Sequence, residues 1–126
     1  MDRAFSKFAL VLLATTAAVA AYAANPIADE KIAVAKASID RAEQSGAPLA
    51  APVELASARD KLARAEKAYA DHDAKPAGLL ADQANIDAQV AEAMALQARA
   101  RKAATEFDTS MQVLRQESTR ASQPAQ

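Results

Sequence analysis

Apolar residues recur every three or four positions in three successive segments of the chain. In the first segment, residues 26–46, the row is Ala28, Ile32, Ala35, Ile39 and Ala42. This spacing puts the row on one face of an α-helix. Asn25 before Pro26 is typical of a helix start, and Gly46 with Pro48 just beyond is typical of a helix end. The first segment is therefore predicted to be one amphipathic helix.

The second segment begins near Pro52 and carries a similar row. Its members are Leu55, Ala58, Leu62, Ala65, Tyr69 and His72. A residue that precedes proline is disfavoured in the helical conformation. Lys75 precedes Pro76, so the second helix is expected to end before Lys75 and the third to begin after Pro76.

The third segment, about residues 77–117, is the longest. Eleven positions there follow an unbroken three–four alternation: Leu79, Gln83, Ile86, Val90, Ala93, Gln97, Ala100, Ala104, Phe107, Met111 and Leu114. All but the two glutamines are apolar. A 3.5-residue period is that of coiled coils. Residues 118–126 are polar and have no period, which predicts a disordered C-terminal tail.

Short connections make successive helices antiparallel neighbours. The predicted fold is therefore all-α, a three-helix antiparallel arrangement with alanine-rich, coiled-coil-like seams and a long third helix. From about Ala98 onward the third helix would have no neighbour from its own chain. The candidate interaction surface is the part of its stripe in that region, Ala100, Ala104, Phe107, Met111 and Leu114. The alternative is a bend near Gln97 that folds the end back onto the first helix.

Composition supports this picture. The chain has 126 residues, of which 37 are alanine, 2 are glycine and none is cysteine. Alanine has the highest helix propensity because it loses no side-chain entropy. The formal net charge of −1 and the scarcity of aromatic residues argue against nucleic-acid binding. Without cysteine there is no disulfide, so helix packing must supply the stability.

The first 23 residues have the pattern of a secretory signal peptide. Arg3 and Lys7 precede an apolar run over residues 8–21, and Ala21-Tyr22-Ala23 is an A-x-A cleavage signature. Cleavage after Ala20 is an alternative, and an uncleaved membrane anchor is another. With no cysteine after the signal, the protein is expected in the periplasm as a soluble protein without a lipid anchor. Residues 24–117 then form its helical domain.

The first two segments also resemble each other, with residues 32–36 and 39–43 matching 55–59 and 62–66 at a constant offset of 23. Over residues 28–101 the chain resembles the DUF4398 domain family. The resemblance is carried by Ser45-Gly46-Ala47-Pro48 leading to Ala51-Pro52-Val53-Glu54-Leu55, by residues 58–65, and by Ala81-Asp82-Gln83-Ala84. At the second turn relatives tend to have Gly-Asp-Tyr, where this chain has His72-Asp73-Ala74.

The resemblance implies a helical domain of the bacterial envelope whose function is unknown. Some relatives are lipoproteins, and some carry an OmpA-like domain that binds peptidoglycan. This chain is expected to have neither feature, so their wall anchoring is not carried over to it.

The residues that carry chemistry in enzymes form no convincing site. His72 is the single histidine, and Asp71 and Asp73 beside it are too few to make a metal site at a helix end. Carboxylates such as Glu106 and Asp108 are expected on a solvated face, where they would also offset the charges of Arg99, Arg101 and Lys102. We therefore expect a non-enzymatic protein with no catalytic residue, cofactor or metal.

The sequence favours a periplasmic interaction or scaffold protein that contacts itself or an envelope protein through its helices. The alternative is a small chaperone-like or carrier protein that shields apolar segments of clients. Such a protein needs a broad, adaptable apolar concavity, often rich in methionine. Only Met94 and Met111 follow the signal, which favours the scaffold.

Overall fold

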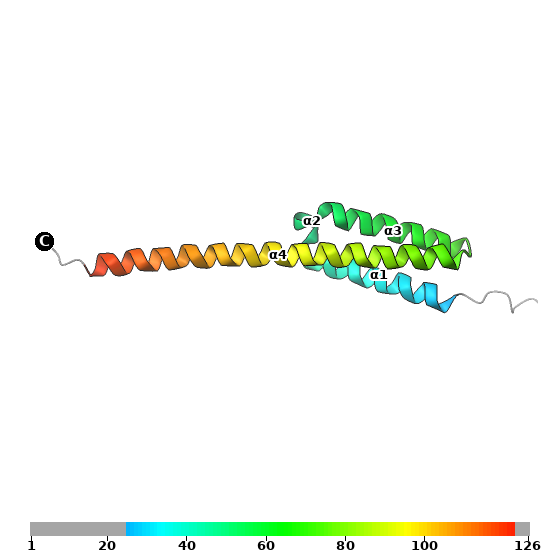
Figure 1. Cartoon of the computed structure of the whole chain (residues 1–126), viewed down its shortest axis with the longest axis horizontal. Coiled ribbons are helices and arrows are strands. Elements are labelled where there is room, and N and C mark those ends of the chain that lie inside the picture. The colour runs from blue at the N-terminus through cyan, green and yellow to red at the C-terminus, as the bar shows by residue number, and fades with distance from the viewer. Residues whose placement is uncertain (1–24, 123–126) are drawn as a thin grey trace, which may run out of the picture.

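The chain is built of helices joined by tight turns (Figure 1). The computed structural model describes residues 25–122. In that part the elements are α1 (Pro26–Gln44), α2 (Ala47–Ala50), α3 (Pro52–Ala70) and α4 (Ala74–Ala121), and there is no strand. This confirms the all-α fold with a long final helix. The short helix α2 lies in the segment that was predicted to be a connection.

α1 is flanked by the residues that the sequence indicates, Asn25 and Gly46. The side chain of Asn25 accepts a hydrogen bond of 3.2 Å from the backbone N–H of Ile27, which caps α1. Gly46 follows α1 with φ of +94°, a left-handed conformation that only glycine adopts without steric cost. Gly46 then serves as the N-cap of α2.

The second turn differs from the prediction. α4 begins at Ala74, so Lys75 and Pro76 lie inside the helix rather than before it. Proline is tolerated there because the N–H groups of the first turn have no partner within the helix. His72, two residues after the end of α3, has a left-handed conformation with φ of +62°.

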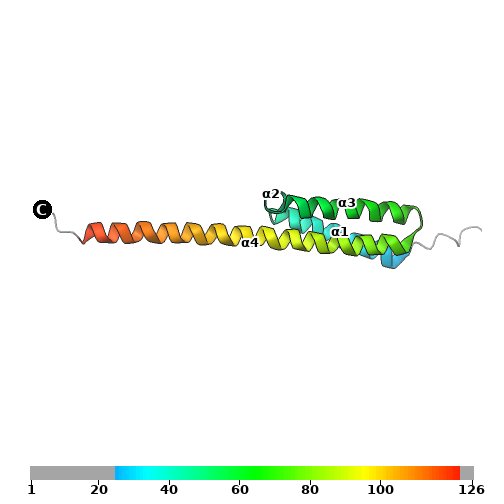
Figure 2. The ribbon, with the colours of Figure 1, turned by 45° about the horizontal axis from the view of Figure 1, so that its top comes forward.

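The three long helices pack with α4 against both α1 and α3 (Figures 1 and 2). Lys31 pairs with Asp82 and, farther along both helices, Arg41 lies 3.8 Å from Glu92, so α1 and α4 run in the same direction. The turn at His72 reverses the chain, so α3 runs antiparallel to α4, and the turn at Gly46 makes α1 antiparallel to α3. Both antiparallel relations follow from the short connections, as predicted.

The apolar rows of α1 and α3 form most of the core. The buried positions that the internal repeat relates are Ile32, Ala35, Ile39 and Ala42 in α1, and Leu55, Ala58, Leu62 and Ala65 in α3. Positions 23 residues apart thus occupy equivalent places in the two helices. Tyr69 is half-buried and His72 is exposed, so the predicted row of α3 leaves the core at its end.

The helix α4 is far longer than its neighbours. It has 48 residues, against 19 each in α1 and α3, and at 1.5 Å per residue it spans about 72 Å. The bundle ends at Ala95, the last buried residue of α4. Residues 96–121, which we call the overhang, extend beyond α2, and after Arg99 they have no neighbour from the described chain (Figure 1).

The overhang is continuous with the rest of α4. No break interrupts the helix near Gln97, so the alternative of a folded-back end is wrong. The helix continues to Ala121, past the predicted end at Glu117. Residues 118–121 of the predicted tail are thus helical. Residues 123–126 and the predicted signal peptide, residues 1–23, lie outside the described part of the chain.

Candidate interaction surface

The side of α4 that contacts the bundle is a row of alanines. Its buried members are Ala77, Ala81, Ala84, Ala88, Ala91 and Ala95. They repeat every three or four residues, so they lie on one face of the helix. Small side chains let the α4 backbone approach α1 and α3 closely, and the methyl groups fill the space that remains.

The predicted stripe of α4 does not form this seam. It is two residues out of step with the alanine row, and at 3.6 residues per turn that offset is about 200° around the helix. Leu79, Ile86 and Val90 are accordingly 59%, 58% and 45% exposed. The expectation that they pack into the bundle is wrong. The helices approach so closely that the smallest apolar side chains, those of alanine, fill the seam, and the larger ones lie outside it. The signal was present in the alanine row, which has the same three–four spacing.

Polar contacts on the α1 side fix the rotation of α4 about its own axis. Lys31 Nζ contacts Asp82 Oδ2. The hydroxyl of Ser38, which is buried, donates a 2.6 Å hydrogen bond to Asn85 Oδ1, and Arg41 donates to the same hydroxyl over 2.9 Å. Buried polar groups need such partners because an unpaired one is costly, so these contacts disfavour other rotations.

A second set of contacts lies on the α3 side. Asp87 Oδ2 accepts hydrogen bonds from Lys61 Nζ over 2.6 Å and from Ser57 Oγ over 2.7 Å. Burial raises the pKa of Asp87, but these two hydrogen bonds and the charge of Lys61 together outweigh burial and hold the pKa below its ordinary value. Asp87 therefore stays ionised and anchors α4 to α3. Held from both sides, α4 must present its larger apolar residues outward.

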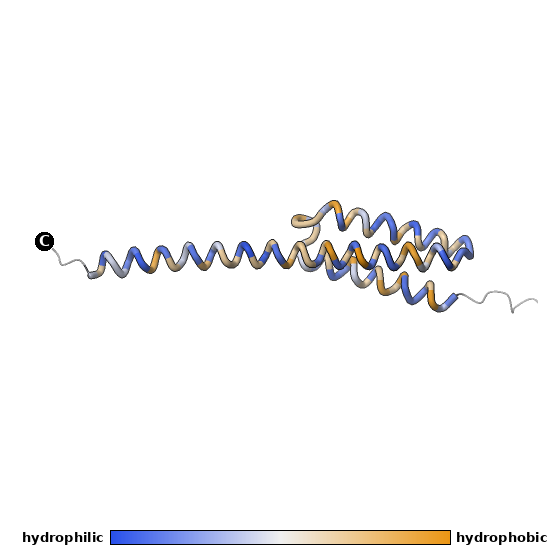
Figure 3. The backbone as a smooth tube through the Cα atoms, in the orientation of Figure 1, coloured by the Kyte–Doolittle hydropathy of each residue, from blue (hydrophilic) through white to orange (hydrophobic). Residues whose placement is uncertain are grey.

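The candidate residues all lie in the overhang. Phe107 and Leu114 are 65% and 58% exposed, Ala100 and Ala104 are exposed, and Met111 is half-buried by its own helix. We call these five residues the overhang stripe. They continue the row of Leu79, Ile86 and Val90, so one apolar face runs along the outside of α4. Figure 3 shows hydrophobic positions recurring along α4 well beyond the bundle.

The opposite face of the overhang is polar. The hydroxyls of Thr105 and Thr109 donate to backbone carbonyls one turn earlier, over 3.0 and 2.9 Å. Lys102 and Glu106 form an exposed ion pair of 3.8 Å within the helix. The alanine row of the bundle thus gives way to solvated side chains after Ala95. The apolar stripe, in contrast, continues along the overhang to Leu114. Its side chains pack against no other helix of the described chain.

Arg99 marks the boundary between the bundle and the overhang. Its guanidinium donates a 3.2 Å hydrogen bond to the backbone carbonyl of Gln44, at the C-terminal end of α1. A cation at this end of a helix also interacts favourably with the helix dipole. Of the predicted basic cluster, Arg99 therefore belongs to the bundle, whereas Lys102 pairs with Glu106 as expected.

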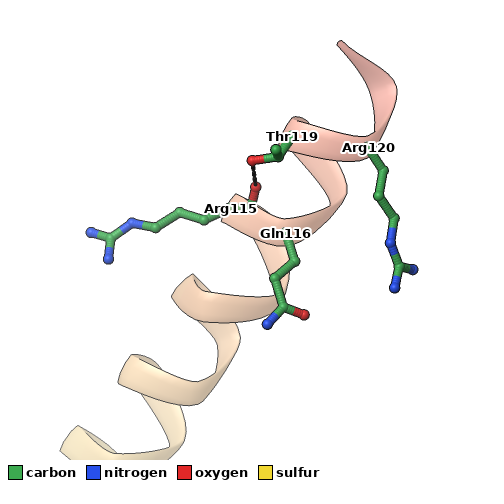
Figure 4. A pocket seen from close by; sticks show the side chains of 4 residues that line it. All are labelled: Arg115, Gln116, Thr119 and Arg120. Carbon is green, nitrogen blue, oxygen red and sulfur yellow. Dashed lines mark hydrogen bonds between the residues drawn. The ribbon is translucent and has the colours of Figure 1, made fainter. Parts of the chain in front are cut away.

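Two open hollows lie on the surface of residues 25–122. One lies at the end of the overhang between Arg115, Gln116, Thr119 and Arg120. Figure 4 shows these side chains fanning out from a single helix, with the Thr119 hydroxyl bonded to the carbonyl of Arg115. A second lies where the start of α1 meets the start of α4, beside Ile27 and Leu79. Neither hollow gathers the buried polar groups that a catalytic site uses.

Within residues 25–122 no group of three or more histidine, cysteine, aspartate and glutamate side chains could hold a metal ion. The same residues contain no helix that is long and apolar enough to cross a membrane. His72 lies exposed in the turn between α3 and α4, next to Asp71 and Asp73. The left-handed backbone of His72 helps to reverse the chain between α3 and α4.

Comparison of the chain with known protein families gives a match over most of the described residues. A family model described as a domain of unknown function (DUF4398) matches residues 30–107. The match spans the bundle and the overhang as far as Phe107. No curated protein and no solved structure matches the chain.

Proposed function

The chain belongs to the DUF4398 family, and from this premise we propose that it is a non-catalytic interaction or scaffold protein of the bacterial cell envelope. It is exported to the periplasm and acts there through helix–helix contacts of the overhang. Its partner is a second copy of itself or another envelope protein, and it uses no cofactor.

One observation carries this proposal. Four of the five residues of the overhang stripe are exposed, on a helix whose rotation is fixed by its contacts with α1 and α3. An exposed row of large apolar side chains gains nothing in water, and such surfaces usually mark interaction sites. The stripe has the three–four spacing that a partner helix recognises.

The scaffold is favoured over the chaperone-like alternative by the shape of the surface. The overhang stripe lies on one straight helix (Figures 1 and 2), which offers a narrow row and not a concavity. A narrow row with a fixed period suits one partner in one register. A protein that shields many clients needs a wider apolar surface that adapts to each of them.

The proposed location rests on the pattern of residues 1–23. If export and cleavage occur as we propose, mass spectrometry of the protein from the envelope fraction will find Ala24 at the N-terminus. An intact Met1 in that fraction would show that the segment is retained as an anchor.

Site-specific photocrosslinking in living cells tests the proposed function. A photoreactive phenylalanine analogue at Phe107 should give one discrete adduct. The matched control is the same analogue at Thr109, on the polar face of the overhang, which should give none. A ladder of many adduct sizes from Phe107 would favour the chaperone-like alternative. Equal yields from both positions would contradict a specific contact.

The absence of catalysis has its own test. Replacing His72 with Gln keeps a polar side chain in the turn and removes the single imidazole. The fold, measured by circular dichroism, and the cellular phenotype should both stay unchanged. A lost phenotype with an unchanged spectrum would assign His72 a chemical role.

A further inference from the structure

We infer that a second copy of the chain covers the overhang stripe and runs in the opposite direction, with the twofold axis between Thr105 and Glu106. The inference rests on the proposed function and names the partner. It follows from three properties of the overhang: the sizes of the stripe residues, the charges beside them, and the continuation of the stripe along the bundle.

The sizes of the stripe residues are complementary in the antiparallel direction. The first two members are small, Ala100 and Ala104, and the next two are large, Phe107 and Met111. In an antiparallel pair about this axis, Ala104 of each copy lies opposite Phe107 of the other, and Ala100 lies opposite Met111. In a parallel pair, alanine would meet alanine and leave a gap at two layers. Close packing therefore favours the antiparallel direction.

The charges beside the stripe select the same arrangement. Arg101 and Asp108 flank it on one side, seven residues apart, and neither has an ion pair within residues 25–122. In the antiparallel pair Arg101 of each copy lies beside Asp108 of the other, which gives two opposite-charge pairs. Sliding the axis along the helix to Asp108 would bring the two Asp108 side chains together. Flanking charges of this kind set the direction and register of helix pairs.

A parallel pair gives these charges no partner. In a parallel pair, the side of one helix that carries Arg101 and Asp108 would face the opposite side of the second helix. That side carries Leu96, Ala103 and Ser110. These residues are uncharged, and Leu96 is 49% exposed. In the antiparallel pair the same uncharged flank meets itself, so Ala103 of one copy lies beside Ser110 of the other and widens the apolar contact.

The stripe also continues onto the bundle. Ala93 and Val90 lie on the free face of α4, opposite the alanine row. In the proposed register they lie opposite Ser118 and Ala121 of the second copy. The contact then covers residues 90–121 of both copies, about 48 Å of helix. The α1 and α3 helices of each copy pack on the far side of α4, so the two bundles lie at opposite ends without overlap.

Disulfide crosslinking tests the direction and register, because the chain has no cysteine of its own. Ala93→Cys and Ser118→Cys are small changes at exposed positions that the proposed register places opposite each other. Within a variant the two equivalent cysteines would lie about 37 Å apart, beyond the ~7 Å between Cα atoms that a disulfide spans. Mixing the two processed variants under mild oxidation should therefore give a mixed disulfide dimer, and neither variant alone should give one.

Sedimentation of the processed protein without cysteine tests self-association independently. Phe107→Asp with Leu114→Asp should raise the dissociation constant of the dimer by about tenfold or more. The matched control is Lys102→Asp with Thr109→Asp on the polar face, which should leave it nearly unchanged. Circular dichroism checks that the bundle remains folded in each variant.

Each contrary result overturns a distinct part of the inference. Dimers linked by Ser118→Cys alone would show a parallel pair. A dimer by sedimentation that gives no mixed disulfide would show a different register. A protein that stays monomeric at high concentration would rule out the second copy as partner. In that last case a discrete adduct at Phe107 in cells would still support the proposed function with a different partner.

Discussion

The two parts of α4 have the same kind of sequence and different surroundings. In the bundle, residues 74–95 bury an alanine row and expose Leu79 and Ile86. In the overhang, residues 96–121 bury nothing and expose the overhang stripe on the same outer face. The comparison teaches that the neighbours of a helix decide which face is buried. Where three helices approach closely, alanine is the residue that fits, and the larger residues are left for another contact.

The two parts also differ in what stabilises them. The bundle part is held by burial and by the polar contacts of Asp82, Asn85 and Asp87. After Arg99, which contacts Gln44, the overhang has only its intrinsic helix propensity and pairs within one helix, such as Lys102 with Glu106. Isolated helices gain little stability in water beyond propensity, so the overhang needs a partner to hold it firmly.

A buried charge would separate the two parts most sharply. Ala88→Asp places a carboxylate in the fully buried alanine row and should lower the free energy of unfolding by about 3–5 kcal/mol, because a buried charge loses its hydration. The same change at Ala104, which is exposed, should alter the unfolding of the monomer by less than about 0.5 kcal/mol. Urea denaturation followed by circular dichroism measures both. Equal losses would mean that the overhang packs on its own bundle.

Replacing each of the two glycines with alanine should change the stability of the bundle in opposite directions. Gly46→Ala forces a side chain into the left-handed conformation and should destabilise the protein by about 1 kcal/mol. Gly78 lies inside α4, where a new Cβ would be 3.5 Å from the Lys31 side chain, an ordinary contact. Gly78→Ala should therefore stabilise by up to about 1 kcal/mol through helix propensity. Thermal unfolding reports both signs, and a loss on Gly78→Ala would show that α1 and α4 tolerate no added methyl group.

The ion pairs of the two parts should respond differently to removal. Asp87→Asn breaks the contact with Lys61 across the α3–α4 seam and should cost about 1 kcal/mol at neutral pH. Glu106→Gln breaks an exposed pair within the overhang and should cost almost nothing. Denaturation at pH 7 compares the two variants.

The pH dependence of the Asp87 effect has a definite sign. The pKa of Asp87 is lowered in the folded protein, so its contribution is complete above the ordinary value of 3.8 and is lost as the pH falls below that value. The difference between wild type and Asp87→Asn should therefore shrink in strong acid. A difference that grows on acidification would contradict the role given to Lys61.

Removing the overhang should have the smallest effect on the bundle. A chain that ends after Arg99 loses the overhang except for its first four residues, and it keeps the hydrogen bond of Arg99 to Gln44 and every buried residue of α4. Its unfolding free energy should stay within about 0.5 kcal/mol of the full chain when both are dilute. Circular dichroism should show fewer helical residues. A truncated chain that fails to fold would show that the overhang stabilises its own bundle.

The sequence was informative about elements and less so about faces. The row of α1, and that of α3 as far as Ala65, were predicted correctly, because Ile32, Ile39 and Leu55 stand out from alanine and lie on the buried side. The last two members of the predicted α3 row, Tyr69 and His72, leave the core. In α4 both the alanine row and the row with Leu79 have helical spacing. Only the position of α1 and α3 around α4 decides between them, and that is a tertiary property.

The candidate residues were predicted to lie beyond the bundle because the third segment is longer than the first two. The third segment was predicted to outrun the first two, and the structure confirms that every residue of the overhang stripe lies past Ala95. The stripe nevertheless does not continue the buried seam of the bundle, because it lies on the outer face of α4. The start of α4 was also misjudged, since Pro76 needs no N–H partner in the first turn of a helix.

Hydrogen exchange at two protein concentrations tests most directly the claim that the overhang is a contact surface and the rest of α4 is not. In dilute solution the amides of residues 100–121 should exchange far faster than those of residues 77–95, because no tertiary contact within the described chain holds residues 100–121. At high concentration the overhang should gain protection, and the bundle part should stay as it was. An overhang that is already as protected as the bundle in dilute solution, or one that gains nothing at high concentration, would contradict the account.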